Sequence, residues 1–244
     1  MKKRANEMTF FEHLGELRKR LLFSIVFIFI FFLVSWFFVD KTYYLLSKPV
    51  LRFLPEGKKL AFTALTDPFM MYIKLAFISG LFIASPFVFH QFWLFLAPGL
   101  FPKEKKLVFP FVFFTTVFFI AGGAFGYLVV FPFACEFFLE IGKDFEAIIT
   151  IDKYFALAFR VLLGISVVFE MPVLSFLLAK LRVISARFLI KYFKYAVVII
   201  FIIAAVITPT PDMITQSIFA VPMLLLYLLS ILIAKIVGPK SEEE

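Results

Sequence analysis

A short segment near the N-terminus carries the side chains best placed to bind a charged partner. Thr9 and Glu12 have the spacing of a capping box, so a helix can start here and continue into the first apolar stretch. That helix has an apolar stripe (Phe10, Leu14, Leu17 and Leu21) and an opposite polar face (His13, Glu16 and Arg20). The spacing alone favours an interfacial helix in which Glu16 and Arg20 form an i,i+4 ion pair, worth about 0.3–0.5 kcal/mol. The Glu16 carboxylate can also accept paired hydrogen bonds from an external guanidinium group.

A second acidic residue lies in a basic loop. Glu104 follows a Pro98-Gly99 turn signal and has lysines at positions 103, 105 and 106 as neighbours. One interpretation is that it balances those lysines. The other is that Glu104 and Glu16 together dock arginine side chains, because acids are rare in the basic segments of this chain. Phe95 and Leu100 are then close enough in sequence to receive apolar residues of the same ligand.

A third carboxylate, Glu170, lies inside an apolar stretch, two residues before Pro172. An ionised carboxylate that faces lipid costs several kcal/mol, so we expect it to be protonated or to face a polar, water-filled indentation. The alternative is a structural hydrogen bond to backbone groups that Pro172 leaves free.

The composition of the chain indicates that lipid is its main solvent. Apolar residues make up 63% of the 244 residues, Phe alone occurs 39 times, and the mean hydropathy is +1.01. Charged residues make up 17%, compared with about 25% in an ordinary soluble domain. One Cys and two His exclude a disulfide framework and a Cys/His zinc site. The net charge of +8 is attributed to cationic loops rather than to nucleic-acid binding.

Six apolar stretches are each close to the ~20 residues that cross a hydrocarbon core. We predict an all-α integral membrane protein, a single polytopic domain over 1–244, with spans at 21–39, 75–97, 107–135, 158–179, 195–208 and 213–234. Four spans contain a proline that is expected to bend them: Pro86, Pro132, Pro172 and Pro222. Gly122 and Gly126 have the G-x-x-x-G spacing that lets a neighbouring helix approach closely.

The loops predict the orientation. Lysines and arginines concentrate before the first span, between the second and third, between the fourth and fifth, and after the last. By the positive-inside rule these segments and both termini are cytoplasmic. Residues 40–68 then form the longest external connection, where apolar residues at helical spacing predict an amphipathic helix on the outer surface (Tyr43, Leu46, Val50 and Leu54). The acid-rich residues 136–153 form a second external loop.

The last two spans are predicted to be short. Pro209 and Pro211 stop the fifth apolar stretch and leave barely enough helix to cross a normal core. A short pair of helices thins the bilayer or recruits a partner helix. Thr208 and Gln216, at the outer ends of these spans, can hydrogen-bond such a partner at about 1 kcal/mol or less each. Ordinary loop-end polarity is the alternative.

The motifs together resemble the TatC family, the polytopic receptor subunits of the twin-arginine protein translocase. The pattern F-x-x-H-L-x-E-L-R-x-R-L at residues 10–21 is similar to the start of that family. The run Pro86…Gln91-x-Trp93-x-Phe95…Pro98-x-Leu100…Glu104 is similar to its first cytoplasmic loop. Further matches are Phe169-Glu170-x-Pro172, Thr208-Pro209-x-Pro211-Asp212 and Gln216. The chain departs from the family at His90, where Tyr is usual, and at Asp67, where Glu is common.

The resemblance implies a receptor and core subunit that exports folded proteins across a prokaryotic cytoplasmic (inner) membrane. It implies signal-peptide binding by Glu16, Arg18, Phe95, Leu100 and Glu104, an intramembrane polar site at Glu170, and partner-helix docking at Thr208, Asp212 and Gln216. The implied partners are twin-arginine signal peptides, single-span TatA- and TatB-type proteins, the lipid bilayer and further copies of the chain, but no nucleic acid. The proton-motive force supplies the energy in that family, no cofactor is implied, and the sequence has no G-x-x-x-x-G-K-[ST] loop for a nucleotide.

Two other functions are alternatives to this one. A proton-coupled small-molecule transporter using Glu170 is the main alternative, since an intramembrane acid is a functional candidate by default. Against it, the first three spans show no repeat in the last three, and no other span carries a deep charged partner. An intramembrane hydrolase is disfavoured, because no span carries a His–carboxylate–nucleophile set or an H-E-x-x-H motif. We therefore predict that the protein is not an enzyme.

Overall fold

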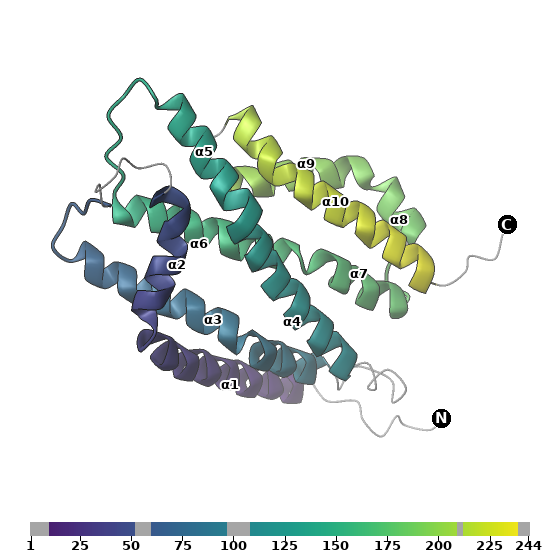
Figure 1. Ribbon diagram of the computed structural model, residues 1–244. Helices are drawn as coiled ribbons and strands as arrows, with labels where there is room; N and C mark the ends of the chain where they lie inside the picture. The colour runs from purple at the N-terminus through teal and green to yellow at the C-terminus, as the bar shows by residue number, and fades with distance from the viewer. Residues whose placement is uncertain (1–9, 52–59, 97–107, 209–211, 239–244) are drawn as a thin grey trace, which may run out of the picture. The chain divides into compact units, whose positions relative to one another are not determined.

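The structure is a computed structural model of the chain, and it describes residues 10–51, 60–96, 108–208 and 212–238. Within these ranges the regular elements are helices, with one isolated β-bridge (Figure 1). They are α1 (Phe10–Trp36), α2 (Val39–Leu51), α3 (Asp67–Leu96), α4 (Val108–Phe125), a π-turn (Gly126–Val130), α5 (Phe131–Ile141), α6 (Ile151–Val168), α7 (Met171–Lys180), α8 (Ala186–Lys191), α9 (Phe193–Ile207) and α10 (Met213–Val237). The predicted all-α fold class is confirmed.

Helices lie at all six predicted spans. Four helical stretches are long and apolar enough to cross a membrane: Asp67–Leu96, Phe109–Ile141, Ile151–Lys180 and Met213–Val237. α1 meets the same test together with α2, from which a sharp bend separates it. The second and fourth of the six helical stretches begin earlier than the predicted spans, at Asp67 and Ile151. Charged side chains near these ends do not stop a helix, because they can reach the membrane surface.

The prediction of two short final spans holds for α9 and is wrong for α10. α9 has 15 residues, a length of about 22 Å against a core of about 30 Å. α10 has 25 residues, a length of about 37 Å. It continues past the predicted end because Lys235 is favourable in the last turn of a helix, and Pro222 does not interrupt it.

The chain forms two compact units. The first comprises Met1–Tyr43 and Tyr72–Val117, and the second comprises Tyr44–Met71 and Phe118–Glu244. Glu16 belongs to the first unit and Glu170 to the second.

In the first unit, α1 packs along α3 at a glycine (Figure 1). A Cβ placed on Gly80 would lie 2.7 Å from the backbone nitrogen of Phe32, so the helices approach more closely than any side chain allows. Phe87 of α3 stacks on Phe27 and Phe31 of α1, with ring centroids 5.0 and 5.3 Å apart. This packing holds the first turns of α1 beside the last turns of α3.

In the second unit, the G-x-x-x-G pair packs against α6, as predicted. A Cβ placed on Gly122 would lie 2.7 Å from the Cα of Ser166, and one on Gly126 would lie 3.5 Å from the Cα of Leu162. Gly126 also opens the π-turn, in which the Phe131 N–H donates to the Gly126 carbonyl. The π-turn ends two residues before Pro132, where the sequence predicts a bend.

α2 is the amphipathic helix predicted in the first external connection, but its apolar face packs inside the protein. Leu46 and Val50 are 7% and 1% exposed. The expectation that this face would rest on the membrane surface is wrong for these two residues, because the second unit offers them a packed interior. Leu54 lies outside the described residues.

Two tyrosine hydroxyls fix α2 to the second unit. Pro49 lies inside α2 and has no N–H, so the Leu45 carbonyl lacks its usual helical donor. Tyr127 donates to that carbonyl at 2.6 Å, and Tyr154 donates to the Leu46 carbonyl at 2.7 Å. The tyrosines therefore satisfy backbone groups more than eighty residues away along the chain.

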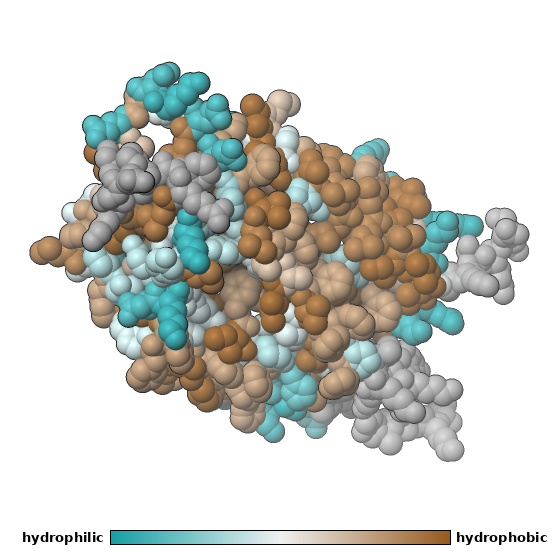
Figure 2. Space-filling model, viewed as in Figure 1, coloured by the Kyte–Doolittle hydropathy of each residue, from teal (hydrophilic) through white to brown (hydrophobic). Residues whose placement is uncertain are grey.

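Apolar and polar side chains occupy different parts of the surface. Figure 2 shows hydrophobic side chains over α9 and α10 and hydrophilic ones over the loop between α5 and α6, which carries the predicted external acids. The β-bridge anchors the end of that loop: the Ala61 N–H donates to Ile149 at 3.0 Å, and the Ile151 N–H donates to Ala61 at 2.8 Å.

Candidate functional site

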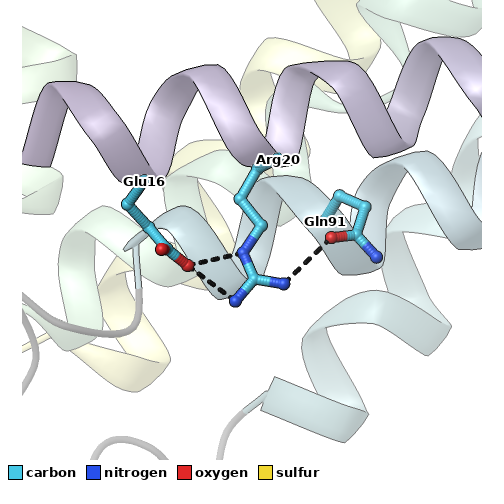
Figure 3. A network of polar contacts seen from close by, with 3 residues as sticks. All are labelled: Glu16, Arg20 and Gln91. Atoms are coloured by element: carbon cyan, nitrogen blue, oxygen red, sulfur yellow. Dashed lines mark hydrogen bonds and ion pairs between the residues drawn. The ribbon is translucent and has the colours of Figure 1, made fainter.

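A carboxylate–guanidinium–amide chain lies where α1 and α3 meet. Arg20 contacts Oε1 of Glu16 with both Nε and Nη2, each at 2.6 Å, so the predicted i,i+4 ion pair is present. Nη1 of Arg20 donates to Oε1 of Gln91 on α3 at 3.2 Å. Figure 3 shows Arg20 between the two acceptors. One guanidinium therefore joins the two helices.

The Glu16 carboxylate is only partly buried. The Glu16 side chain is 19% exposed and that of Arg20 is 23% exposed. Among the described residues, the contacts of the Glu16 carboxylate are made through Oε1. Its Oε2 has no hydrogen-bond partner among the described residues.

An aromatic contact stands beside the ion pair. The imidazole of His13 stacks on the ring of Phe95, with centroids 4.5 Å apart. Phe95 is half-buried, in the last turn of α3. The predicted site residues Glu16 and Phe95 thus lie on the two helices that this stack and Arg20 join. Arg18 is exposed on α1, whereas Glu104 and Leu100 lie outside the described residues.

Glu170 occupies the break between α6 and α7 in the second unit. It is 8% exposed, and both of its carboxylate oxygens lack a hydrogen-bond partner among the described residues. The alternative of a hydrogen bond to backbone freed by Pro172 is therefore not observed in this part of the chain. The Ser166 hydroxyl, one turn earlier on α6, is also buried without a described partner. Ser166 and Glu170, which are neighbours in one span, thus both have side chains without a hydrogen-bond partner among the described residues.

The three residues predicted to dock a partner helix have different environments. Thr208 is buried, and its hydroxyl donates to the Ala204 carbonyl at 3.0 Å. Asp212 caps α10, where its carboxylate accepts the Thr215 N–H at 2.8 Å and the Thr215 hydroxyl. Gln216 is half-buried, and its side chain has no hydrogen-bond partner among the described residues. Gln216 is thus the one of the three with free hydrogen-bonding capacity there.

An apolar groove of about 620 Å³ lies along one face of α10, and Gln216 is not among its lining residues. The π-turn, α5 and the first half of α10 line it, through residues that include Val129, Phe133, Met213, Ile214, Ser217 and Val221. Within the described ranges, no group of three or more His, Cys, Asp and Glu is arranged to hold a metal ion.

Sequence reasoning missed the contacts that join distant segments. The partnership of Arg20 with Gln91 spans 71 positions, and no spacing rule connects them. Gly80 was also missed, because its partner is a backbone segment of α1 rather than a second glycine. The available signal was indirect: His13, Arg20 and Gln91 all belong to the motifs that carry the family resemblance.

Known proteins similar to the chain agree with this fold. The family described as Sec-independent protein translocase protein (TatC) matches residues 12–222. A TatC protein of Koribacter versatilis is 43% identical over 240 residues, which cover 97% of this chain and 89% of the relative. A TatC protein of Helicobacter pylori is 43% identical over 234 residues, covering 95% and 89%. A crystal structure of a twin-arginine translocase receptor, TatC, in DDM superposes with a TM-score of 0.83 at 34% identity, covering 91% of this chain and 99% of that one.

Fold and site together define a multi-pass, all-helical membrane protein with a carboxylate–guanidinium contact at the head of its first span. Within that class, the chain belongs to the TatC family of Sec-independent protein translocase proteins. This is a family of protein translocase components and not of enzymes. Because these components move proteins, the alternative of a small-molecule transporter built on Glu170 is not favoured.

Proposed function

We propose that the chain is the receptor and core subunit of a twin-arginine protein translocase in a prokaryotic cytoplasmic membrane. It binds twin-arginine signal peptides with Glu16 and Glu104 at the cytoplasmic face. With single-span TatA- and TatB-type partners, and further copies of itself, it exports folded proteins using the proton-motive force. Membership of the TatC family supports this function.

One observation carries the proposal: Glu16 already holds a guanidinium. Arg20 approaches its Oε1 through two nitrogens at 2.6 Å, a geometry that an arginine of a signal peptide can reproduce at the open Oε2. Each exposed pair of this kind contributes only about 0.2–1 kcal/mol, so binding is modest and weakens with salt. Specificity comes from two guanidinium groups meeting two carboxylates. Arg18, which is exposed on the same helix as Glu16, belongs to the proposed signal-peptide site.

Phe95 and Leu100 receive the apolar residues that follow the arginines. Phe95 is half-buried against His13, so part of its ring remains accessible beside the ion pair. A signal peptide would therefore meet charged and apolar groups in sequence, with the carboxylates ahead of the ring.

Photocrosslinking of a twin-arginine signal peptide to the purified full chain tests this site. Glu104→Gln and Glu16→Gln should abolish or strongly reduce the crosslink, and a twin-lysine peptide should crosslink weakly, since an ammonium cannot make paired hydrogen bonds. Glu12→Gln, one turn away on the same helix, is the matched control and should crosslink normally. Normal crosslinking and export by both the Glu16 and the Glu104 variants would place recognition elsewhere.

The docking site for a single-span partner is proposed at Thr208, Asp212 and Gln216. The amide of Gln216 supports it, since it has no hydrogen-bond partner among the described residues and polar side chains can hydrogen-bond across neighbouring membrane helices. Crosslinks from position 216 should capture a TatA-type helix in an active complex. A probe at Leu232, exposed near the other end of α10, serves as control. Capture from 232 but not from 216 would contradict the site.

The proposed orientation has both termini in the cytoplasm. A cysteine at position 104 should then react only with reagent added from the cytoplasmic side, and the native Cys135 should contribute little background because it is buried. Labelling of position 104 from the outside would overturn the orientation. Uptake of a small solute by the reconstituted chain alone, lost in Glu170→Gln, would instead favour the transporter.

A further inference from the structure

The hairpin between α7 and α9 carries positive charge without any compensating acid. Its five cations are all exposed: Lys180, Arg182, Arg187, Lys191 and Lys194. No Asp or Glu occurs between Met171 and Pro211. Among the described residues, none of the five cations has a carboxylate within ion-pair distance. We call this surface the basic hairpin. Within the described part of the chain, the electrostatic potential over it is therefore positive throughout.

The basic hairpin has a fixed backbone. Ser185 caps α8, since its hydroxyl accepts the Phe188 N–H at 3.2 Å. Tyr227 of α10 donates its hydroxyl to the Leu189 carbonyl at 2.9 Å. α9 begins two residues after Lys191, so most of the cations project from helical turns held against α10. The cations are thus presented at defined positions before any ligand arrives.

Aromatic and aliphatic side chains alternate with these cations. The ammonium of Lys191 lies 6.0 Å from the ring centroid of Tyr192, and that of Lys194 lies 5.0 Å from the ring centroid of Tyr195. Phe188, Ile190 and Tyr195 are about half exposed or more. Apolar and cationic side chains that share the end of two apolar helices fit the boundary between lipid headgroups and acyl chains.

Membrane orientation alone does not require this pattern. The positive-inside rule depends on lysines and arginines, and acids affect it little. The other basic segments of this chain accordingly keep acids: Glu16 before the first span, Glu104 in the first internal loop, and 242–244 in the C-terminal tail. The complete absence of acids from the basic hairpin needs another reason, and a negatively charged ligand supplies one.

We propose that the basic hairpin is a binding surface for anionic phospholipids. Arg187, Lys191 and Lys194 contact the lipid phosphates, while the exposed rings and aliphatic side chains enter the upper acyl region. A lipid suits this surface better than an acidic protein, because exposed rings and aliphatic side chains accompany the cations at the ends of two apolar helices. Three such cations favour an anionic over a zwitterionic headgroup by roughly 100-fold at low ionic strength.

Site-directed quenching measures this preference directly. A fluorophore is attached at Ala186→Cys in the full chain, with Cys135→Ala, and the protein is placed in nanodiscs. Nanodiscs leave both faces accessible, so the orientation of insertion does not affect the result. Nitroxide-labelled phosphatidylglycerol should quench the probe far more than nitroxide-labelled phosphatidylcholine, and added salt should reduce the difference.

Variants assign the preference to the basic hairpin. The triple variant R187Q/K191Q/K194Q should quench equally with both lipids, whereas K191R/K194R should retain the preference. The matched control is K41Q/K48Q, because Lys41 and Lys48 make similar cation–π contacts, to Phe38 and Tyr44, at a different part of the chain. It should behave like the parent. Equal quenching in the parent, or a preference that survives the triple variant, overturns the proposal, as does a response to soluble polyglutamate but not to phosphatidylglycerol.

Discussion

Glu16 and Glu170 are both glutamates on helices of a membrane protein, yet their surroundings are opposite. Glu16 is partly exposed and shares its Oε1 with Arg20, which also reaches Gln91. Glu170 is buried, and neither of its oxygens has a partner among the described residues. A carboxylate that holds a guanidinium in water can exchange it for another at small cost. A buried carboxylate without a partner must obtain one from water, a proton or a second molecule.

The difference indicates two kinds of site in one chain. The first is preformed, because helix packing at Gly80 fixes the positions of Arg20 and Gln91. The second is incomplete within the described residues. We expect the preformed site to tolerate substitution with little loss of stability, and the incomplete one to gain stability when its polarity is removed.

The largest effect is expected at Gly122, which packs against the α6 backbone at Ser166, one turn before Glu170. In Gly122→Leu the new side chain must displace the α6 backbone, since even a Cβ would lie 2.7 Å from the Ser166 Cα. We expect the free energy of unfolding in detergent to fall by about 3 kcal/mol or more. Gly126→Ala is the control: its Cβ would lie 3.5 Å from the nearest backbone and should change stability by about 1 kcal/mol at most. Equal losses in both variants would contradict this account of the packing.

Removing the unpartnered carboxylate tests the comparison itself. Glu170→Met keeps a similar volume and should raise the free energy of unfolding by about 1–3 kcal/mol, because the desolvation cost of an unsatisfied group disappears. Thermal unfolding in detergent measures this gain, while export of twin-arginine cargo should be lost. Glu16→Met in the same assay should leave stability nearly unchanged. A destabilised Glu170→Met would mean that Glu170 has a partner within the chain.

Tyr127 and Tyr154, which donate to carbonyls of α2, extend the comparison to backbone groups. Tyr127→Phe leaves the Leu45 carbonyl without a donor and should cost about 1 kcal/mol. Pro49→Ala restores an N–H four residues later, so it should recover this loss in the double variant. The stability lost in Tyr154→Phe should not be recovered by Pro49→Ala, because the helical donor to the Leu46 carbonyl is the N–H of Val50 and not that of residue 49. Unfolding measurements on the two double-mutant cycles distinguish these outcomes.

The smallest effect is expected at the partly buried Glu16–Arg20 ion pair. Arg20→Gln removes the guanidinium between Glu16 and Gln91 and should change the free energy of unfolding by only about 0.2–1 kcal/mol. The loss should shrink further as salt is added. A loss several times larger, insensitive to salt, would show that this pair is a structural bridge rather than an exchangeable one.

Local periodicity predicted much of this structure from the sequence. The Glu16–Arg20 pair, the helix that carries it and the close approach at Gly122 all follow from spacings of three or four residues. The Arg20–Gln91 contact, the packing of Gly80 on Phe32 and the tyrosine bonds to α2 do not, because each depends on which helices are neighbours. α10 extends three residues beyond its predicted end at position 234, because Lys235 is favourable in its last turn. Local rules therefore find elements and pairs within them, whereas contacts between elements require the fold.

The π-turn at Gly126–Val130 has a consequence for how the family can change. A π-turn holds one residue more than the α-helical turn it replaces, which is equivalent to a single-residue insertion. Its five residues cover about the same rotation as four residues of an α-helix, so deleting one residue there would restore an α-helix and leave the residues after it facing nearly the same way. Phe131, Ala134 and Cys135 would then stay buried. A one-codon deletion between Gly126 and Val130 is therefore open to evolution, whereas the same deletion in the regular turns of α6 would rotate the rest of that helix by about 100°.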